Sequence, residues 1–141
     1  MIAFLDTSAI VPLLIDEPGT PVCLRVWEAA DVLVCTQLAF VETAAALSRA
    51  TRLGRMTPGQ RDTSLTRLND LWQQLDAMAV DEPLIREAAA LTADLPLRGY
   101  DAVHCAAAVR LAGPGTVAVS GDRELLGAWR SEGLDVVDTL A

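Results

Sequence analysis

The sequence contains no lysine, because all 11 of its basic residues are arginine. This absence excludes the mechanisms that depend on a lysine amine: the phosphate-binding P-loop, Schiff-base chemistry and the receiver-domain phosphorylation switch. Aromatic residues are also scarce, at 4% of the chain, so the core must be built from Ala, Val, Leu and Ile. Since 52% of the residues are hydrophobic, the chain has enough apolar side chains to fold.

Long apolar runs are missing as well. No run approaches the roughly 18 residues of a membrane span, so we expect no membrane association. The N-terminus has no basic region and reaches an acid at residue 6, which argues against a signal peptide.

The cysteines Cys23, Cys35 and Cys105 are scattered without CxxC spacing. We expect them to be buried thiols in a reducing cytosol, which predicts a cytoplasmic protein.

Positive charge is in deficit, because 19 acidic residues against 11 basic ones give a net charge of -8. This is the wrong sign for a protein that simply adheres to nucleic acid. An acidic protein can still act on phosphates when a bound metal ion makes its site positive. The charge therefore directs attention to sites that hold a cation.

The first dozen residues contain the feature around which the other candidates are arranged. Residues 2–5 form an apolar run without a polar face, which predicts a short buried strand. The run stops at Asp6, and we expect Thr7 and Ser8 to cap an apolar turn over residues 9–14. A carboxylate at the end of a strand lies where ligands bind in open α/β sheets.

The rest of the chain alternates between predicted strands and helices. Further strands are expected at 32–35, 78–80, 116–120 and 134–137. Six helices are expected between these strands. The first three run from Thr20 to about 30, from a Thr36 cap to 53, and onward from a capping box at 57–60. The other three run from residues 81–83 to 93, over 102–112 and from 123 to about 133. This alternation predicts a single α/β domain over residues 1–141, with helices on both faces of a parallel sheet.

Three more acids, Glu42, Asp101 and Asp122, fall at comparable ends of these elements. Four clustered carboxylates repel by about 4 kcal/mol for each close pair, so the cluster calls for bound protons or cations. Oxygen ligands without a His pair or a Cys cluster suit Mg²⁺ or Mn²⁺ rather than zinc. We therefore interpret the four acids as a divalent-metal site.

Each of these residues also has an ordinary structural interpretation. Asp6 and Asp122 fit a turn or helix cap, and Asp101 fits a favourable charge in the first turn of a helix. Glu42 is harder to explain in this way, because residues 38–47 are mostly apolar. We expect His104 to be structural.

Exposed residues near the acids offer candidate contacts to a substrate. Tyr100 fits either stacking on a nucleobase or simple packing. Arginines near the acids can guide an RNA backbone or can merely form solvated helix surface. The candidates for RNA contact are Arg49, Arg52, Arg98 and Arg123.

The segments around the acids resemble the four motifs of PIN-domain ribonucleases. These segments are residues 5–9, 41–42, 100–104 and 120–125. The length and layout of the chain are similar to those of VapC-type toxins of bacterial toxin–antitoxin pairs. The family often has Ala where this chain has Gly121, and we expect this difference to change only local packing. Whether Glu124 is a metal ligand stays open.

The resemblance implies a five-stranded parallel sheet in order 3-2-1-4-5 inside a three-layer α/β/α sandwich. In this arrangement Asp6 and Asp122 meet where the strand order reverses. The resemblance further implies that Mg²⁺ or Mn²⁺ is held by the four acids, and that Thr7 or Ser8 and Ser120 bond to these ligands. It also implies an RNA substrate, a cognate antitoxin and a homodimer.

A metal-dependent endoribonuclease is the function that we predict from these observations. One alternative is a carboxylate-metal phosphatase acting on small phosphate esters. Phosphatases of the haloacid-dehalogenase type need a second Asp two residues after the first, where this chain has Ser8, and a Lys that is missing. A second alternative is a binding module whose acids only cap helices.

Overall fold

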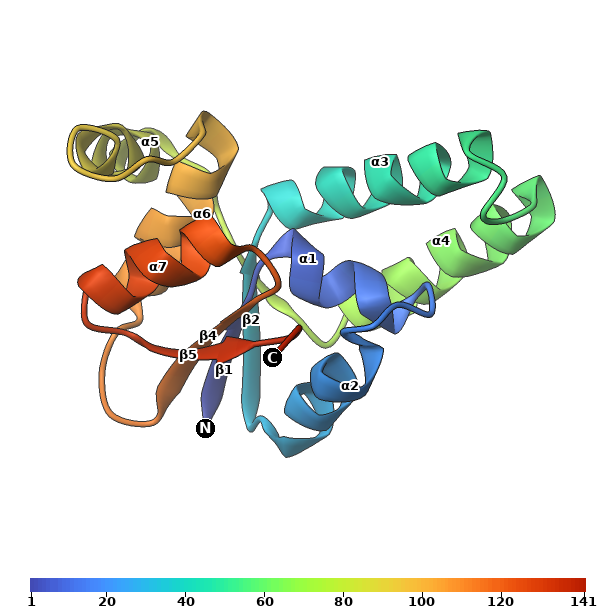
Figure 1. The fold of residues 1–141 in the computed structure, drawn as a ribbon, viewed down its shortest axis with the longest axis horizontal. Helices are drawn as coiled ribbons and strands as arrows, with labels where there is room; N and C mark the ends of the chain where they lie inside the picture. Colours follow the sequence, from blue (N-terminus) through green and yellow to red (C-terminus); the bar gives the residue numbers. More distant parts are fainter.

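Five parallel strands form one sheet in the order β3-β2-β1-β4-β5 (Figure 1). The computed structural model describes all residues 1–141. The predicted strand order is therefore confirmed. The strands are β1 (Ile2–Leu5), β2 (Val32–Thr36), β3 (Asp76–Met78), β4 (Thr116–Ser120) and β5 (Asp135–Asp138).

Seven α-helices and one 3-10 turn connect the strands. They are α1 (Thr7–Ile10), the turn η1 (Val11–Leu13), α2 (Thr20–Ala29), α3 (Leu38–Arg52), α4 (Pro58–Trp72), α5 (Glu82–Leu91), α6 (Gly99–Arg110) and α7 (Arg123–Ser131). Figure 1 shows α3 and α4 running side by side away from the sheet. None of the helices is long and apolar enough to cross a bilayer.

The sheet is covered on both faces, as alternating side-chain directions along its strands require. Phe4 of β1 lies in the core cluster shared with α5, α6 and α7, where its ring meets that of Trp129 edge-on at 5.9 Å. The neighbouring residue Leu5 lies in a second cluster, shared with α1, α2, α3 and α4. This confirms the predicted three-layer α/β/α sandwich.

The three cysteines are free and buried, as predicted. Burial raises the pKa of Cys23 to about 11 and the pKa values of Cys35 and Cys105 to about 12. These thiols therefore stay protonated near neutral pH and behave as small core residues.

The third strand begins two residues earlier than predicted, at Asp76 rather than residue 78. Pairing with β2 determines its position, because Val34 is aligned with Asp76 and Thr36 with Met78. Since β3 is an edge strand, an exposed aspartate is tolerated at its first position. The fifth strand, on the opposite edge of the sheet, also begins with an aspartate, Asp135, and starts one residue later than predicted.

The predicted hydroxyl caps of α1 and α3 are wrong, and the predicted capping box before α4 is confirmed. Asp6, rather than Thr7 or Ser8, caps α1, since its Oδ1 accepts the N–H of Ala9 at 3.2 Å. Thr36 ends β2 and does not cap α3. The predicted capping box before α4 forms as a reciprocal pair of hydrogen bonds between Thr57 and Gln60, at 2.8 and 3.1 Å.

Candidate active site

One cavity of about 340 Å³ brings together four acids from distant parts of the sequence. Asp6 follows β1, Glu42 lies in the second turn of α3, Asp101 lies in the first turn of α6, and Asp122 precedes α7. The cavity therefore opens beside the carboxyl ends of the adjacent central strands β1 and β4. The predicted gathering of these four side chains at one edge of the sheet is present in the structure.

Asp6 is the most buried of the four acids, with 5% of its surface exposed. Ser8 donates a hydrogen bond to its Oδ1 at 2.7 Å, and Ser120 donates one to its Oδ2 at 2.8 Å. Burial raises the pKa of Asp6 to about 6, even though these hydroxyl groups act in the opposite direction. The ionised carboxylate is therefore poorly stabilised by the protein alone.

The two serines also join the ends of β1 and β4. The Ser8 hydroxyl accepts the N–H of Gly121 at 2.8 Å, and the Ser120 hydroxyl accepts the N–H of Asp122 at 2.9 Å. Their two oxygens are 3.1 Å apart. These contacts fix the orientation of Asp6 relative to the segment that carries Asp122.

Glu42 is held through only one of its two oxygens. Its Oε1 accepts hydrogen bonds from Thr7 Oγ1 at 2.8 Å and from His104 Nε2 at 2.6 Å, whereas Oε2 accepts none. Partial burial works to raise the pKa of Glu42, but the hydrogen bond and charge of His104 and the bond from Thr7 together hold it below its usual value. Glu42 is therefore ionised near neutral pH, with one oxygen unpaired.

Asp101 and Asp122 have carboxylate oxygens that no hydrogen bond of the protein occupies. Asp101 accepts none, and its pKa is raised by burial and then by the negative charges of Asp122 and Glu42. Asp122 Oδ1 caps α7 by accepting the N–H groups of Glu124 and Leu125 at 2.9 and 3.2 Å, which leaves Oδ2 unpaired. Capping is therefore a real role of Asp122, and it leaves an oxygen for another partner.

The donor set fits a hard divalent cation in its chemistry, because carboxylate oxygens line the cavity and several of them are unpaired. As the side chains stand, no three of the His, Cys, Asp and Glu side chains are close enough together to hold one ion. Like charges separate when nothing neutralises them. Ligation of one ion would therefore require the acids to approach one another, and neither Asp101 nor Asp122 Oδ2 has a hydrogen bond that this movement would break.

Two ionisable residues that line this cavity, His104 and Glu17, were not among the site residues predicted from the sequence. His104 was expected to be structural, yet it bonds directly to Glu42. Its position three residues after Asp101, on the same face of α6, was the available signal. Glu17 lies in the loop after η1, where nothing in the sequence marks it, and it accepts a hydrogen bond from Arg55 at 3.3 Å.

The four candidate arginines are exposed, and none of them makes an ion pair. Arg98 is near enough to Asp101 for its charge to lower the pKa of that acid against the larger effect of burial. Arg123 directly follows Asp122. Arg49 and Arg52 lie about 10 and 15 Å from Glu42 along α3, at 1.5 Å per residue. Two of the four arginines therefore lie close to cavity acids in the sequence, and the other two lie further along α3.

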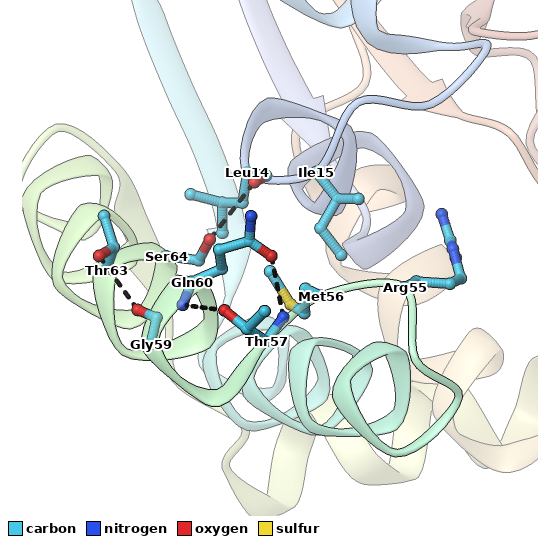
Figure 2. Close-up of a pocket in the computed structure, with 9 residues that line it drawn as sticks. All are labelled: Leu14, Ile15, Arg55, Met56, Thr57, Gly59, Gln60, Thr63 and Ser64. Carbon is cyan, nitrogen blue, oxygen red and sulfur yellow. Dashed lines mark hydrogen bonds between the residues drawn. The ribbon is translucent and has the colours of Figure 1, made fainter.

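A second cavity of about 460 Å³ lies between the 3-10 turn and the connection from α3 to α4 (Figure 2). It contains no acidic residue, so it does not fit a divalent cation. Figure 2 shows Thr57 and Gln60 bonded to each other at its rim. Arg55 lines this cavity and bonds to Glu17 of the acidic one, so the two cavities are neighbours.

Comparison with known proteins gives matches over most of the chain. The PIN domain family matches residues 3–127. Ribonuclease VapC49 of Mycobacterium tuberculosis is 31% identical over 124 residues, which cover 88% of this chain and 86% of that protein. The crystal structure of FitAcB from Neisseria gonorrhoeae has a TM-score of 0.73 at 16% identity, covering 99% of this chain and 98% of that one. A toxin–antitoxin complex from Klebsiella pneumoniae has a TM-score of 0.67 at 14% identity, covering 97% of each chain.

Proposed function

This chain belongs to the PIN-domain family, and we propose that it is an endoribonuclease that uses a divalent metal ion to hydrolyse RNA phosphodiester bonds. The observation that carries the proposal is the convergence of four carboxylates, from four separate elements, on one cavity. The name of the relative VapC49, a ribonuclease, supports the same activity. We assign this activity to residues 1–141 acting as one nuclease domain.

In this proposal Mg²⁺ or Mn²⁺ is held by Asp6, Glu42, Asp101 and Asp122. A divalent ion held there would lower the pKa of a bound water and would neutralise charge on the leaving oxygen. The protein contributes orientation: Ser8 and Ser120 fix both oxygens of Asp6. Thr7 fixes one oxygen of Glu42 and leaves the other directed to a ligand.

RNA binding is assigned to the unpaired arginines around this cavity. Arg98 and Arg123 lie beside Asp101 and Asp122, where they can contact the phosphates that flank the scissile bond. Arg49 and Arg52 extend the positive surface along α3 toward the next nucleotides. Local positive charge of this kind offsets the net charge of -8.

We further propose that the protein is the toxin of a toxin–antitoxin pair and is inhibited by a cognate antitoxin. The VapC name of its relative and the shared fold with a toxin–antitoxin complex support this partner. The three buried free thiols are consistent with a reducing cytoplasm.

A homodimer is proposed for the apolar surface beside the cavity. Val41, Ile85 and Tyr100 are exposed there by 60%, 46% and 67%. Tyr100 borders two grooves, one shared with Val41 and one with Ile85, so it is not a core residue. Analytical ultracentrifugation of Val41→Glu tests this assignment: the variant should be monomeric at concentrations where the wild type is dimeric.

The central experiment replaces Asp101 with Asn. The variant should lose RNA cleavage and growth inhibition while keeping its far-UV circular dichroism spectrum, and Mn²⁺ should no longer raise its melting temperature. Asp70→Asn, an exposed change on α4 away from the cavity, is the matched control and should behave as the wild type. Undiminished cleavage by the Asp101→Asn variant would contradict the proposal.

The phosphatase alternative is not favoured by the geometry around Ser8. The residue two positions after Asp6 is a hydroxyl that donates to Asp6 and accepts from Gly121, so it supports the acid instead of supplying a second carboxylate. A colorimetric phosphatase assay run beside RNA cleavage separates the two activities. We expect no hydrolysis of small phosphate esters.

A further inference from the structure

His104 belongs to a chain of hydrogen bonds that runs from the end of β2 to the acidic cavity. Its side chain is buried, with 2% of the residue exposed, and it lies one turn after Asp101 on α6. Nε2 is 2.6 Å from Glu42 Oε1, and Nδ1 is 3.3 Å from Thr36 Oγ1. The imidazole therefore connects a buried hydroxyl group to one of the four acids.

The direction of the bond between His104 and Glu42 follows from the carboxylate. An ionised carboxylate only accepts hydrogen bonds, so Nε2 must carry a proton. Nδ1 lies 3.3 Å from the Thr36 hydroxyl, which accepts a hydrogen bond from the charged ring and donates one to the neutral ring. Thr36 is fully buried and has no other hydrogen-bond partner for its side chain. The hydrogen bonds thus run from Thr36 through His104 to Glu42, and the Nε2–H group donates to the carboxylate in either form of the ring.

Both bonds to Glu42 converge on the same oxygen. Thr7 and His104 reach Oε1 from α1 and α6, which fixes the rotation of the carboxylate about its last torsion. The other oxygen, Oε2, is left without a partner in the protein and is available to the cavity. An apolar residue at position 104 would free this rotation and would leave the Thr36 hydroxyl unpaired.

We propose that His104 is a positioning residue that presents Glu42 Oε2 to the divalent cation. The inference rests on the proposed function, since it specifies how one of the assigned ligands is oriented. In this role His104 differs from a residue that merely fills the core. Its effect on cation binding should depend on the Nε2–H group and not on the volume of the ring. Partners that orient metal ligands typically change metal affinity by 10–100-fold when they are removed.

The first test uses the fact that the chain has one histidine, so its imidazole signals are unambiguous. ¹⁵N-resolved NMR of the protein in chelator should show a protonated Nε2 with a downfield, slowly exchanging proton. Glu42→Gln should move this proton upfield. Mg²⁺ should shift the signal in the wild type and not in Asp101→Asn. An imidazole proton that exchanges freely and is the same in Glu42→Gln would overturn the inference.

The second test compares two variants at position 104 by Mn²⁺ titration, with far-UV circular dichroism as the check on folding. His104→Leu should weaken Mn²⁺ binding by at least about tenfold. His104→Gln keeps an N–H donor near the position of Nε2 and should recover most of that affinity. Equal, wild-type affinities in the two variants would refute the positioning role while leaving the metal site intact. If the wild type itself fails to bind Mn²⁺, the proposed function fails first and the inference fails with it.

Discussion

Ser120 at the end of β4 donates a hydrogen bond to Asp6 at the end of β1, with 2.8 Å between Oγ and Oδ2. This contact crosses the point where the strand order reverses, which is where ligands bind in open α/β sheets. It orients a carboxylate whose burial favours the protonated form, and it partly offsets that effect. The pair therefore links the topology of the sheet to the charge state of the site.

Replacing Ser120 with Ala should destabilise the protein by about 1–3 kcal/mol at pH 7, because Asp6 loses a donor and the N–H of Asp122 loses its acceptor. Urea denaturation in chelator measures the change. Ser131→Ala is the control, since its hydroxyl bonds only to the carbonyl of Ala128 near the end of α7. Equal losses in the two variants would show that Ser120 has no special role at Asp6.

The contribution of Asp6 to the metal-free stability of the protein should fall as the pH rises from about 4 to 7. The pKa of Asp6 is raised from 3.8 to about 6, so its contribution is fully present below pH 4 and is lost as the pH passes 6. The loss is on the order of 3 kcal/mol, at 1.36 kcal/mol per pKa unit. Asp6→Asn removes this dependence.

Asp6→Asn should therefore be more stable than the wild type at pH 7.5 in chelator, and the difference should shrink near pH 4. The opposite dependence of Glu42, whose lowered pKa gives stability that is lost on acidification, is present in both proteins and cancels in the comparison. Saturating Mg²⁺ should reverse the order at pH 7.5, since the wild type alone gains binding free energy. Parallel pH profiles for the two proteins would exclude this account of Asp6.

The central strands were predictable because both of their faces are buried. Short, mostly apolar runs predicted β1 at residues 2–5 and β4 at residues 116–120, and both strands have these bounds in the structure. The edge strands β3 and β5 each begin with an exposed aspartate and are only partly buried. Their positions depend on pairing with the neighbouring strand, which local sequence does not encode.

The candidate site was predictable to the extent that its residues lie at the ends of elements. Asp6 and Asp122 follow recognisable strands, and Glu42 stands out as an acid among apolar neighbours. The role of His104 depends on a tertiary contact between α6 and α3, which gives it a carboxylate partner 62 residues away in the sequence. Glu17 enters the cavity through the path of a loop, which no periodicity describes.

Removing Arg98 and Arg123 together should weaken RNA binding and reduce its salt dependence. Each lost phosphate contact lowers the slope of log affinity against log salt by about 0.7 for single-stranded RNA. Fluorescence anisotropy with labelled RNA measures both quantities, using Asp101→Asn as the background to prevent cleavage. Arg86→Gln is the control, because that guanidinium is already paired with Glu82 on α5. An unchanged slope in the double variant would remove these arginines from the RNA contact.

Gly121 determines how closely the C-terminal segment approaches the site. A Cβ atom at this position would lie 2.9 Å from Thr139 Oγ1, and Thr139 is buried, with 2% exposed. The same hydroxyl lies close to Gly19, where an added Cβ atom would be 3.2 Å from it. Gly121→Ala should therefore destabilise the protein by about 1–3 kcal/mol through overpacking.

The same contact predicts a specific rescue. Thr139→Ala removes the atom that an alanine at position 121 would meet, so the double variant should be more stable than the sum of the single changes, by at least about 0.5 kcal/mol in a double-mutant cycle. Gly127→Ala on α7 is the control: a Cβ there meets nothing within 4 Å, and helix propensity favours the change by about 0.8–1 kcal/mol. Additive effects at positions 121 and 139 would show that the backbone between Ser120 and Asp122 shifts instead, in which case Gly121→Ala should also weaken Mn²⁺ binding by displacing both residues.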